Sequence, residues 1–336
     1  MTFAQCMDER RWNALVKALP EHGIYQSWSW GELRAGPQRD VRRFALFESG
    51  LPRAAASVEL RRMQRLPFRV AYAPRGPLWV DTEHLLLFAS HLSSALKREG
   101  VLYLKVNPSG DPVRAAALQQ AGFAPVPRPD LTFGGILPHL TARLPLATVR
   151  EVYRAMEPEA RRRVRQAERR GILVESASSA EQMAEFYPWL LRTAQRQGFG
   201  LPPEGALRAM AGAWLRRREG MLFLARHEGA PIGGALCSFF GDEGCGHFLA
   251  DDPAQRSLSA VYALYAAGIE EAARRGCRFF DLGGIRAADD ADGLFRFKRQ
   301  FGASAHRHLG EWNLPLSSLW YRVLTRVSHG ALPRHI

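Results

Sequence analysis

Two halves of this 336-residue chain run through the same order of secondary structure. In each half the apolar pattern predicts three successive strands separated by short turns, then an amphipathic helix that ends at a glycine, then a buried strand. The segments are 42–50, 51–62, 68–80, 84–100 and 101–110 in the first half and 221–229, 230–240, 245–253, 257–276 and 277–284 in the second. Both copies continue into a short helix with a similar ending, LQQAGFAPV from Leu118 and FKRQFGASA from Phe297. A repeat of this length predicts two mixed α/β domains in tandem.

The chain is strongly basic. Its formal net charge is +13 and its pI is near 10.2, while 46% of its residues are hydrophobic and 24% are charged. This composition is that of an ordinary globular protein and excludes a disordered or fibrous chain. The basic excess favours a polyanionic partner such as nucleic acid, anionic lipid headgroups or a phosphorylated substrate.

The sequence carries no recognisable membrane, targeting or metal signal. No apolar run reaches the roughly 18 residues of a membrane span, and the N-terminal MTFAQCMDERRW lacks the pattern of a signal peptide. The four cysteines, Cys6, Cys237, Cys245 and Cys277, have no CxxC spacing, so we expect neither a zinc site nor a disulfide framework. These observations predict a cytoplasmic protein without a bound metal.

Lysine is rare in this chain, and one lysine occupies an unusual context. Only four of the 46 basic side chains are lysines (Lys17, Lys97, Lys105 and Lys298), which leaves 46 − 4 = 42 arginines. Lys298 lies in GLFRFKRQFG, directly after Phe297. Unlike arginine, lysine is a compact ammonium whose pKa shifts readily on burial. Lys298 is therefore a candidate catalytic residue; the alternative is a solvated lysine on an amphipathic helix.

The order of elements in each half resembles the core of the GNAT acyltransferase fold. Acetyltransferases of that fold hold the pyrophosphate of coenzyme A on a glycine-rich loop at the N-terminus of the central helix. The corresponding turn of the second copy is Arg256-Ser-Leu-Ser-Ala-Val, with Ser259 where a glycine would let the backbone approach the phosphate. The first copy has the acidic turn Asp81-Thr-Glu-His. We therefore expect acyl transfer without coenzyme A or any other bound cofactor.

Seven segments carry a family pattern in order along the chain. They are IYQSWSWGELRAG from Ile24, YAPRGPL from Tyr72, LKVNP from Leu104, EARRRVRQAERRGILVE from Glu159, TAQRQGF from Thr193, RFFDLGGI from Arg278 and GLFRFKRQFG from Gly293. Together they resemble the Fem-type (FemXAB) peptidoglycan bridge-forming aminoacyltransferases, typified by lipid II:glycine glycyltransferase. The resemblance covers most of the chain and implies two tandem GNAT-like domains. The chain has no room for the coiled-coil arm that some members insert, so it resembles the compact members.

The resemblance implies a tRNA-dependent reaction. An amino acid moves from aminoacyl-tRNA to the side-chain amine of a peptidoglycan precursor, UDP-linked or lipid-linked, to form an interpeptide bridge. The ester is already activated, so the enzyme chiefly positions the amine and stabilises the tetrahedral oxyanion. By resemblance, Lys298 supplies positive charge to that oxyanion and Phe297 helps to form the pocket for the tRNA acceptor end.

Four further residues are candidate contacts of the precursor. Arg75, held in a Pro-Arg-Gly-Pro turn, would suit a carboxylate or phosphate; its alternative is an ion pair with a structural aspartate. Arg196 in TAQRQG is the candidate for the diphosphate, because bidentate arginine contacts suit phosphate oxygens. Trp30 and Tyr72 are candidates for the sugar and peptide groove, or else plain core aromatics.

The remaining site residues concern RNA binding and proton transfer. Arg162, Arg165 and Arg169 lie on a predicted basic helix and are candidate contacts for the tRNA backbone, with a solvated helix face as the alternative. No signature of a general base stands out. Asp81 and Asp281 are candidates, and a reaction in which the substrate assists its own deprotonation is the alternative.

We expect one domain at 1–145 and the other at 146–315. Residues 316–336 have the pattern of an amphipathic helix that packs back on the first domain, and transient contact with the inner face of the membrane is the alternative. Two other functions stay open: a GNAT-type N-acyltransferase that uses acyl-CoA on another amine, and a non-catalytic RNA- or membrane-binding relative. The sequence does not identify the amino acid transferred, the acceptor form, the stem-peptide residue extended or the oligomeric state.

Overall fold

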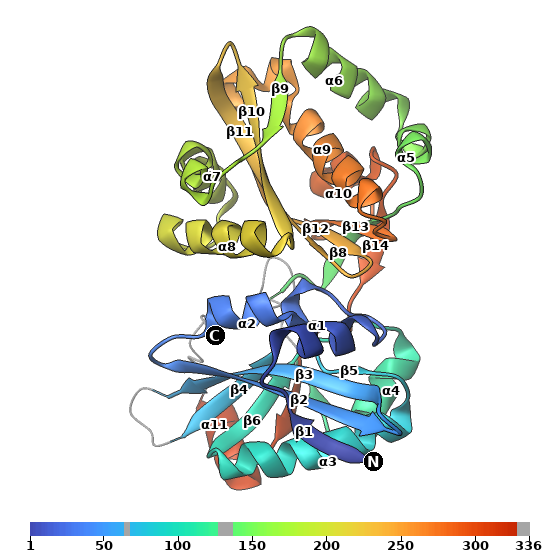
Figure 1. Cartoon of the computed structure of the whole chain (residues 1–336), viewed down its shortest axis with the longest axis vertical. Helices are drawn as coiled ribbons and strands as arrows, with labels where there is room; N and C mark the ends of the chain where they lie inside the picture. The colour runs from blue at the N-terminus through green and yellow to red at the C-terminus, as the bar shows by residue number, and fades with distance from the viewer. Residues whose placement is uncertain (64–67, 127–136, 328–336) are drawn as a thin grey trace. The chain divides into compact units, whose positions relative to one another are not determined.

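The computed structural model describes residues 1–63, 68–126 and 137–327, and the chain divides into two compact units. Unit 1 comprises Met1–His139 together with Arg307–Ile336, and unit 2 comprises Leu140–His306. Each unit has its own mixed β-sheet with helices packed on it (Figure 1). The predicted fold class, two tandem GNAT-like α/β domains, is confirmed by this architecture and by the comparisons reported below.

Unit 1 is built on an eight-stranded sheet of order β1-β2-β3-β4-β6-β15-β7, with β5 paired to β3. Helices α1 and α2 lie on one face of this sheet and α3 on the other (Figure 1). The elements are β1 (Thr2–Gln5), α1 (Glu9–Lys17), η1 (Ile24–Gln26), α2 (Trp28–Arg34), β2 (Arg39–Glu48), β3 (Leu51–Arg62), β4 (Arg69–Ala73), β5 (Leu78–Trp79), α3 (Thr82–Arg98), β6 (Val101–Val106), α4 (Pro112–Gln120), β7 (Ala124–Pro125), β15 (Trp312–Pro315) and α11 (Ser318–Val327).

Unit 2 is built on a seven-stranded sheet of order β14-β8-β13-β12-β11-β10-β9. Helices α7 and α8 lie on one face of the sheet and α9 on the other (Figure 1). The elements are β8 (Leu140–Pro145), α5 (Val149–Ala155), α6 (Pro158–Arg169), β9 (Leu173–Ser176), η2 (Ala180–Gln182), α7 (Met183–Gln197), α8 (Glu204–Arg217), β10 (Gly220–His227), β11 (Ala230–Phe240), β12 (Glu243–Asp251), η3 (Pro253–Leu258), α9 (Ala260–Arg274), β13 (Phe279–Gly284), α10 (Gly293–Arg299) and β14 (Ser304–Arg307).

The two units repeat one core order. In unit 1 it runs β2-β3-β4-α3-β6-α4-β7 and in unit 2 it runs β10-β11-β12-α9-β13-α10-β14. Each sheet then receives one more strand between its last two: β15 lies between β6 and β7, and β8 lies between β13 and β14. Strand β8 therefore belongs to unit 2 and β15 to unit 1, so the units divide at 139/140 and 306/307 and not at the expected 145/146 and 315/316.

The central helices of the two units begin differently. Helix α3 follows Asp81, whose carboxylate accepts a hydrogen bond from the backbone N–H of His84, as an N-cap does. Helix α9 follows Ser259, which has a left-handed φ of +62° and makes no side-chain cap. The amphipathic face of each helix is buried against its own sheet, which provides the main hydrophobic core of each unit.

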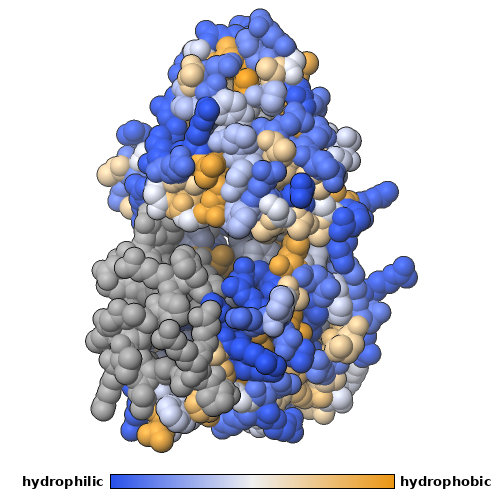
Figure 2. Space-filling view, turned by 90° about the vertical axis from the view of Figure 1, so that its left-hand side faces the viewer, coloured by the Kyte–Doolittle hydropathy of each residue, from blue (hydrophilic) through white to orange (hydrophobic). Residues whose placement is uncertain are grey.

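The C-terminal helix α11 packs on unit 1. The ring of Tyr321 meets that of Tyr103 edge-on at 5.8 Å, and its hydroxyl accepts a hydrogen bond of 3.0 Å from Nδ2 of Asn313. Residues 328–336 of the predicted C-terminal segment lie outside the described residues. Within the described ranges, no helix combines the length and apolarity needed to cross a membrane. Figure 2 shows one face of the surface, where hydrophilic residues predominate and hydrophobic ones are scattered among them.

Candidate active site

The candidate site of unit 2 is built where two neighbouring parallel strands separate. Strand β12 pairs with β13 only where Glu243–Cys245 of β12 lie beside Phe279–Asp281 of β13. Strand β12 then continues to Asp251 and β13 to Gly284 without further pairing between them. The pairing of β11 with β12 is also irregular after Leu236. Ligands of open α/β sheets bind beyond the carboxyl ends of strands that part in this way. The separation therefore marks a position where a substrate can enter the sheet.

The amine of Lys298 lies at the end of β13. Its side chain comes from α10, only 4% of it is exposed, and its Nζ donates a hydrogen bond of 2.8 Å to the carbonyl oxygen of Gly284. Burial lowers the pKa of Lys298 to about 8, against the opposing effect of the Asp281 carboxylate. The solvated-lysine alternative is thus wrong: Lys298 is a buried amine with a perturbed pKa, which is typical of functional sites.

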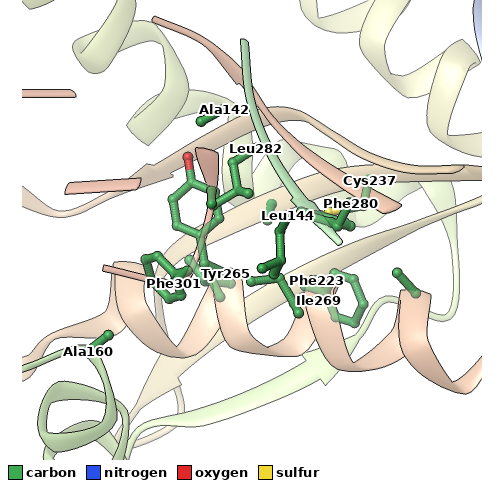
Figure 3. Close-up of a cluster of buried hydrophobic side chains, with 14 of the residues drawn as sticks. Ala142, Leu144, Ala160, Phe223, Cys237, Tyr265, Ile269, Phe280, Leu282 and Phe301 are labelled. Atoms are coloured by element: carbon green, nitrogen blue, oxygen red, sulfur yellow. The ribbon is translucent and has the colours of Figure 1, made fainter. Parts of the chain in front are cut away.

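Phe297 belongs to an aromatic cluster between α9 and α10. Its ring centroid lies 5.1 Å from that of Tyr262, 5.6 Å from that of Tyr265 and 5.6 Å from that of Phe301. Figure 3 shows Tyr265 and Phe301 beside α9 within the core of unit 2. Phe297 itself is half-buried, so part of the ring is open to a ligand. Sequence reasoning missed Tyr262, although its spacing of three from Tyr265 on a helix indicates a shared face.

The basic helix α6 adjoins this cluster. The charges of Arg163 and Arg162 act on the hydroxyl of Tyr262, whose pKa is raised mainly by burial. Arg162 is bound to Glu159 at 2.7 Å. The other two predicted RNA contacts, Arg165 and Arg169, are exposed on α6 and make no ion pair with the residues that the structure describes.

The C-terminal end of α6 is tied to the segment before α9. Gln166 and Arg170 both donate hydrogen bonds to the carbonyl oxygen of Ser257 in η3. The basic helix is therefore fixed relative to the start of α9 inside unit 2. Of the predicted tRNA-binding arginines, Arg162 is thus near the aromatic cluster that contains Phe297.

Arg196 lies on the last turn of α7 and is exposed. Burial raises the pKa of Asp251, the last residue of β12, and the charges of Arg256 and Arg196 oppose that rise. Arg196 therefore lies near the carboxyl end of β12. An exposed guanidinium there is compatible with the predicted diphosphate contact.

The other predicted substrate residues lie in unit 1. Arg75 is 8% exposed; its guanidinium donates to the carbonyl oxygen of Pro138 at 2.8 Å, and its backbone N–H donates to Oδ1 of Asn107 at 2.8 Å. The hydrogen bond to Pro138 joins the 74–77 turn to residue 138. The alternative of an ion pair between Arg75 and a structural aspartate is not what the structure shows in the residues it describes. The ring of Trp30 is half-buried and meets Tyr25 edge-on at 4.7 Å. Tyr72 is enclosed in the sheet, where burial raises its pKa, so a direct substrate contact through its hydroxyl stays a prediction.

The two candidate bases have different surroundings. The Asp81 carboxylate binds the backbone N–H and the Nδ1 of His84, and the backbone hydrogen bond chiefly lowers the pKa of Asp81. A capping carboxylate with a lowered pKa is a weak proton acceptor. Asp281 is buried and accepts a hydrogen bond of 2.7 Å from the backbone N–H of Gly283, beside Lys298.

A cavity of about 360 Å³ lies elsewhere in unit 2, between α6, α9, β9 and β10. Its walls include Val174, Met221 and Phe223, with Glu168 and Glu270 among its polar lining. None of the predicted site residues lines it, so the candidate chemistry does not depend on this cavity. In the part of the chain that the structure describes, no cluster of three or more His, Cys, Asp or Glu side chains could hold a metal ion.

The start of α9 differs from a coenzyme A loop. Ser259 and Ala260 are both buried, and the preceding residues form η3 in place of a glycine-rich turn. A pyrophosphate held at a helix N-terminus needs open backbone N–H groups. That this chain works without the usual GNAT acyl carrier stays a prediction.

Comparison with known proteins finds acyltransferases among the proteins that this chain resembles. Residues 154–299 match the family model described as acetyltransferase (GNAT) domain. A lipid II:glycine glycyltransferase from Staphylococcus haemolyticus is 21% identical over 94% of this chain and 93% of its own length. The crystal structure of FemX has a TM-score of 0.87 at 19% identity, covering 96% of this chain and all of FemX. A tandem GNAT protein from the clavulanic acid biosynthesis pathway has a TM-score of 0.55 at 15% identity, covering 94% of this chain and 98% of its own.

Proposed function

We propose that this chain, which resembles the Fem-type aminoacyltransferases, transfers an amino acid from aminoacyl-tRNA to an amine of a peptidoglycan precursor. The acceptor would be the side-chain amine of the stem peptide, and the product the first or next amide bond of an interpeptide bridge. The lipid II:glycine glycyltransferase relative supports the acceptor class. The tRNA donor is supported by the basic α6 helix and by the buried start of α9.

The observation that carries the proposal is the buried Lys298 amine at the end of β13. In the reaction the acceptor nitrogen forms a bond to the ester carbonyl carbon, and the carbonyl oxygen becomes an oxyanion. Collapse of the tetrahedral intermediate breaks the ester C–O bond, the ribose oxygen leaves as a hydroxyl, and the attacking nitrogen loses a proton.

Lys298 would bind the developing oxyanion. An ammonium has three donors, and the Gly284 carbonyl accepts one of them. In a site shielded from water, removal of one such donor typically costs about 3 kcal/mol of transition-state stabilisation. The Phe297 ring would stack on the terminal base of the tRNA acceptor end, since base stacking on aromatic side chains is sequence-tolerant.

The other side chains would bind the two polyanionic substrates. Arg165 and Arg169 would contact the tRNA backbone without reading its sequence, which makes binding sensitive to salt. Arg196 would contact the diphosphate of the precursor. Deprotonation of the attacking amine would be assisted by the substrate itself, because Asp81 is engaged as a helix cap.

A transfer assay tests the proposal directly. Purified protein is incubated with total tRNA charged with labelled amino acids and with a lysine- or ornithine-containing precursor, in UDP-linked and lipid-linked form, and the products are analysed by mass spectrometry. The expected result is a precursor heavier by one or more amino acid residues, which also identifies the amino acid. A parallel reaction with acetyl-CoA as donor should give no product. Product from acetyl-CoA and none from charged tRNA would replace this proposal by the acyl-CoA alternative.

A further inference from the structure

Asp281 shapes the turn that follows β13. Its side chain is 6% exposed, and one carboxylate oxygen accepts the backbone N–H of Gly283, two residues later, at 2.7 Å. A hydrogen bond of this kind from an aspartate to the backbone defines a local turn. Gly283 has a φ of +86°, a left-handed conformation that glycine adopts without strain.

The same turn holds the amine of Lys298. Its Nζ donates to the carbonyl oxygen of Gly284, the residue after the turn glycine. A side chain added at Gly283 would put its Cβ 3.6 Å from Nζ, so the amine rests against this glycine. The carboxylate that forms the turn therefore also determines where the Gly284 carbonyl meets the lysine.

Three ionisable groups act on Lys298 from the elements around it: Asp281 from β13, Cys245 from β12 and Asp292 at the start of α10. Of these, Asp281 favours the charged amine most strongly. Burial acts in the opposite direction and brings the pKa of Lys298 to about 8. The charge of the Lys298 amine near neutral pH thus depends on two opposing effects: burial favours the neutral amine, and the Asp281 carboxylate favours the ammonium.

We propose that Asp281 is the positioning residue of Lys298, which aims the amine through the Gly283 turn and keeps it an ammonium. Its role in catalysis rests on the proposed function, because an oxyanion needs the charged form of the lysine. The effect on the charge of Lys298 does not depend on that function. This assigns Asp281 a place in the site other than that of a general base.

Because the chain has only four lysines, the titration of Lys298 can be followed by NMR. Protein labelled with ¹³C at lysine should give only four sets of side-chain Cε signals, which Lys298→Ala would assign. The shift of the Lys298 Cε signal with pH gives the midpoint of its titration. In the wild type we expect a midpoint near pH 8. In Asp281→Asn, which keeps an oxygen acceptor for the Gly283 N–H, we expect a midpoint lower by about one pH unit or more.

Asp292→Asn is the matched control. It removes a carboxylate whose effect on Lys298 is smaller, and the amide can still accept the hydrogen bonds of a helix N-cap. We expect a smaller shift of the midpoint than in Asp281→Asn. An unchanged midpoint in Asp281→Asn, or an equal shift in both variants, would overturn the proposal.

A measurement on the wild type keeps the test independent of whether Asp281→Asn folds. The ¹³C signal of the Asp281 carboxylate should show a second inflection at the pH where Lys298 loses its proton. Absence of that inflection would also overturn the proposal.

The catalytic consequence is read separately. The transfer rate should fall as pH rises through the Lys298 midpoint, and in Asp281→Asn this fall should move to lower pH together with the NMR midpoint. If the midpoint shifts but no donor supports transfer, the proposed function fails and the positioning role stands. If transfer occurs but its pH profile is the same in both proteins, the positioning role fails and the proposed function stands.

Discussion

The last helix of the repeated core carries a leucine in unit 1 and a lysine in unit 2. Gly122 and Gly302 follow these helices with left-handed φ values of +86° and +90°. Four residues before each glycine, Leu118 corresponds to Lys298, and one residue earlier Ala117 corresponds to Phe297. Leu118 is fully enclosed in the apolar core of unit 1, whereas the Lys298 amine is bound to the Gly284 carbonyl. The two copies share a scaffold, and the candidate catalytic side chains are present in one of them.

The neighbouring parallel strands of the two units also differ, in how far they stay paired. In unit 1, β4 and β6 stay paired up to Ala73 and Val106, the last residues of both strands. In unit 2, β12 and β13 separate after Cys245 and Asp281. Because ligands of such sheets bind where neighbouring strands part, we expect no equivalent entry point in unit 1. From this difference we expect the chemistry in unit 2 and a binding role for unit 1.

The largest expected effect comes from placing the unit 2 residue in unit 1. Leu118→Lys would bury an amine in an apolar cluster, and we expect it to destabilise the protein by about 4 kcal/mol, the cost of a pKa shift of roughly three units. Unfolding in urea measures the change. Leu118→Met, which preserves the volume, should cost less than about 1.5 kcal/mol. A Leu118→Lys variant as stable as Leu118→Met would mean that the two positions do not differ as described.

The reverse exchange should stabilise the protein. The pKa of Lys298 is lowered from 10.5 to about 8, so the folded state disfavours the protonated form. This penalty is complete below pH 8 and disappears as pH rises toward 10.5, because the folded state then loses its proton before the unfolded state does. Lys298→Leu should therefore be more stable than the wild type at pH 7, by up to about 3 kcal/mol, and the gain should shrink between pH 8 and pH 10. A stability difference between the two proteins that stays constant from pH 8 to pH 10 would contradict the pKa shift.

Phe297→Ala places the alanine of unit 1 in unit 2. It removes one ring from the cluster with Tyr262 and Tyr265. We expect a loss of about 2 kcal/mol of stability for a half-buried ring and about a tenfold higher KM for aminoacyl-tRNA through lost stacking. Steady-state kinetics with varied tRNA measures this, and Phe297→Tyr should retain most of the affinity. An unchanged KM would remove Phe297 from the RNA site.

The smallest effect concerns exposed arginines. Arg165→Gln and Arg169→Gln in unit 2 should each weaken tRNA binding by about 1 kcal/mol at low salt and reduce the slope of log K against log salt by about one. Filter binding at several salt concentrations measures both. Arg98→Gln, on the exposed last turn of α3 in unit 1, is the control and should change neither quantity. Equal effects in all three variants would indicate a general dependence on net charge.

The sequence predicted the repeated order because that order depends on local patterns. The helix expected at 257–276 is α9 at Ala260–Arg274, and the glycine that follows it has a φ of +75°. The strand expected at 68–80 is instead divided into β4 and β5, since the 74–77 turn interrupts the ladder. The positions of β8 and β15 could not be predicted, because short strands are assigned to a sheet by their partners in space.

The candidate site was predictable in its residues and not in its geometry. Motif resemblance pointed to Lys298 and Phe297, but the bond from Nζ to the Gly284 carbonyl joins residues fourteen positions apart. The turn from Asp281 to Gly283 is local, but its contact with the Lys298 amine depends on how α10 packs beside β13. The enclosure of Tyr72 likewise follows from its partners on β3 and β6.

The most direct test of the assignment to unit 2 is the single-turnover rate of amide formation from aminoacyl-tRNA by the wild type and by Lys298→Leu. Both proteins are checked for folding at the same pH, and the acceptor is saturating. We predict that the variant is slower by a factor of about 10² to 10³, the usual effect of removing one oxyanion donor. A folded Lys298→Leu variant with a rate within about threefold of the wild type would contradict the account, because so small a ratio is under 1 kcal/mol of transition-state stabilisation.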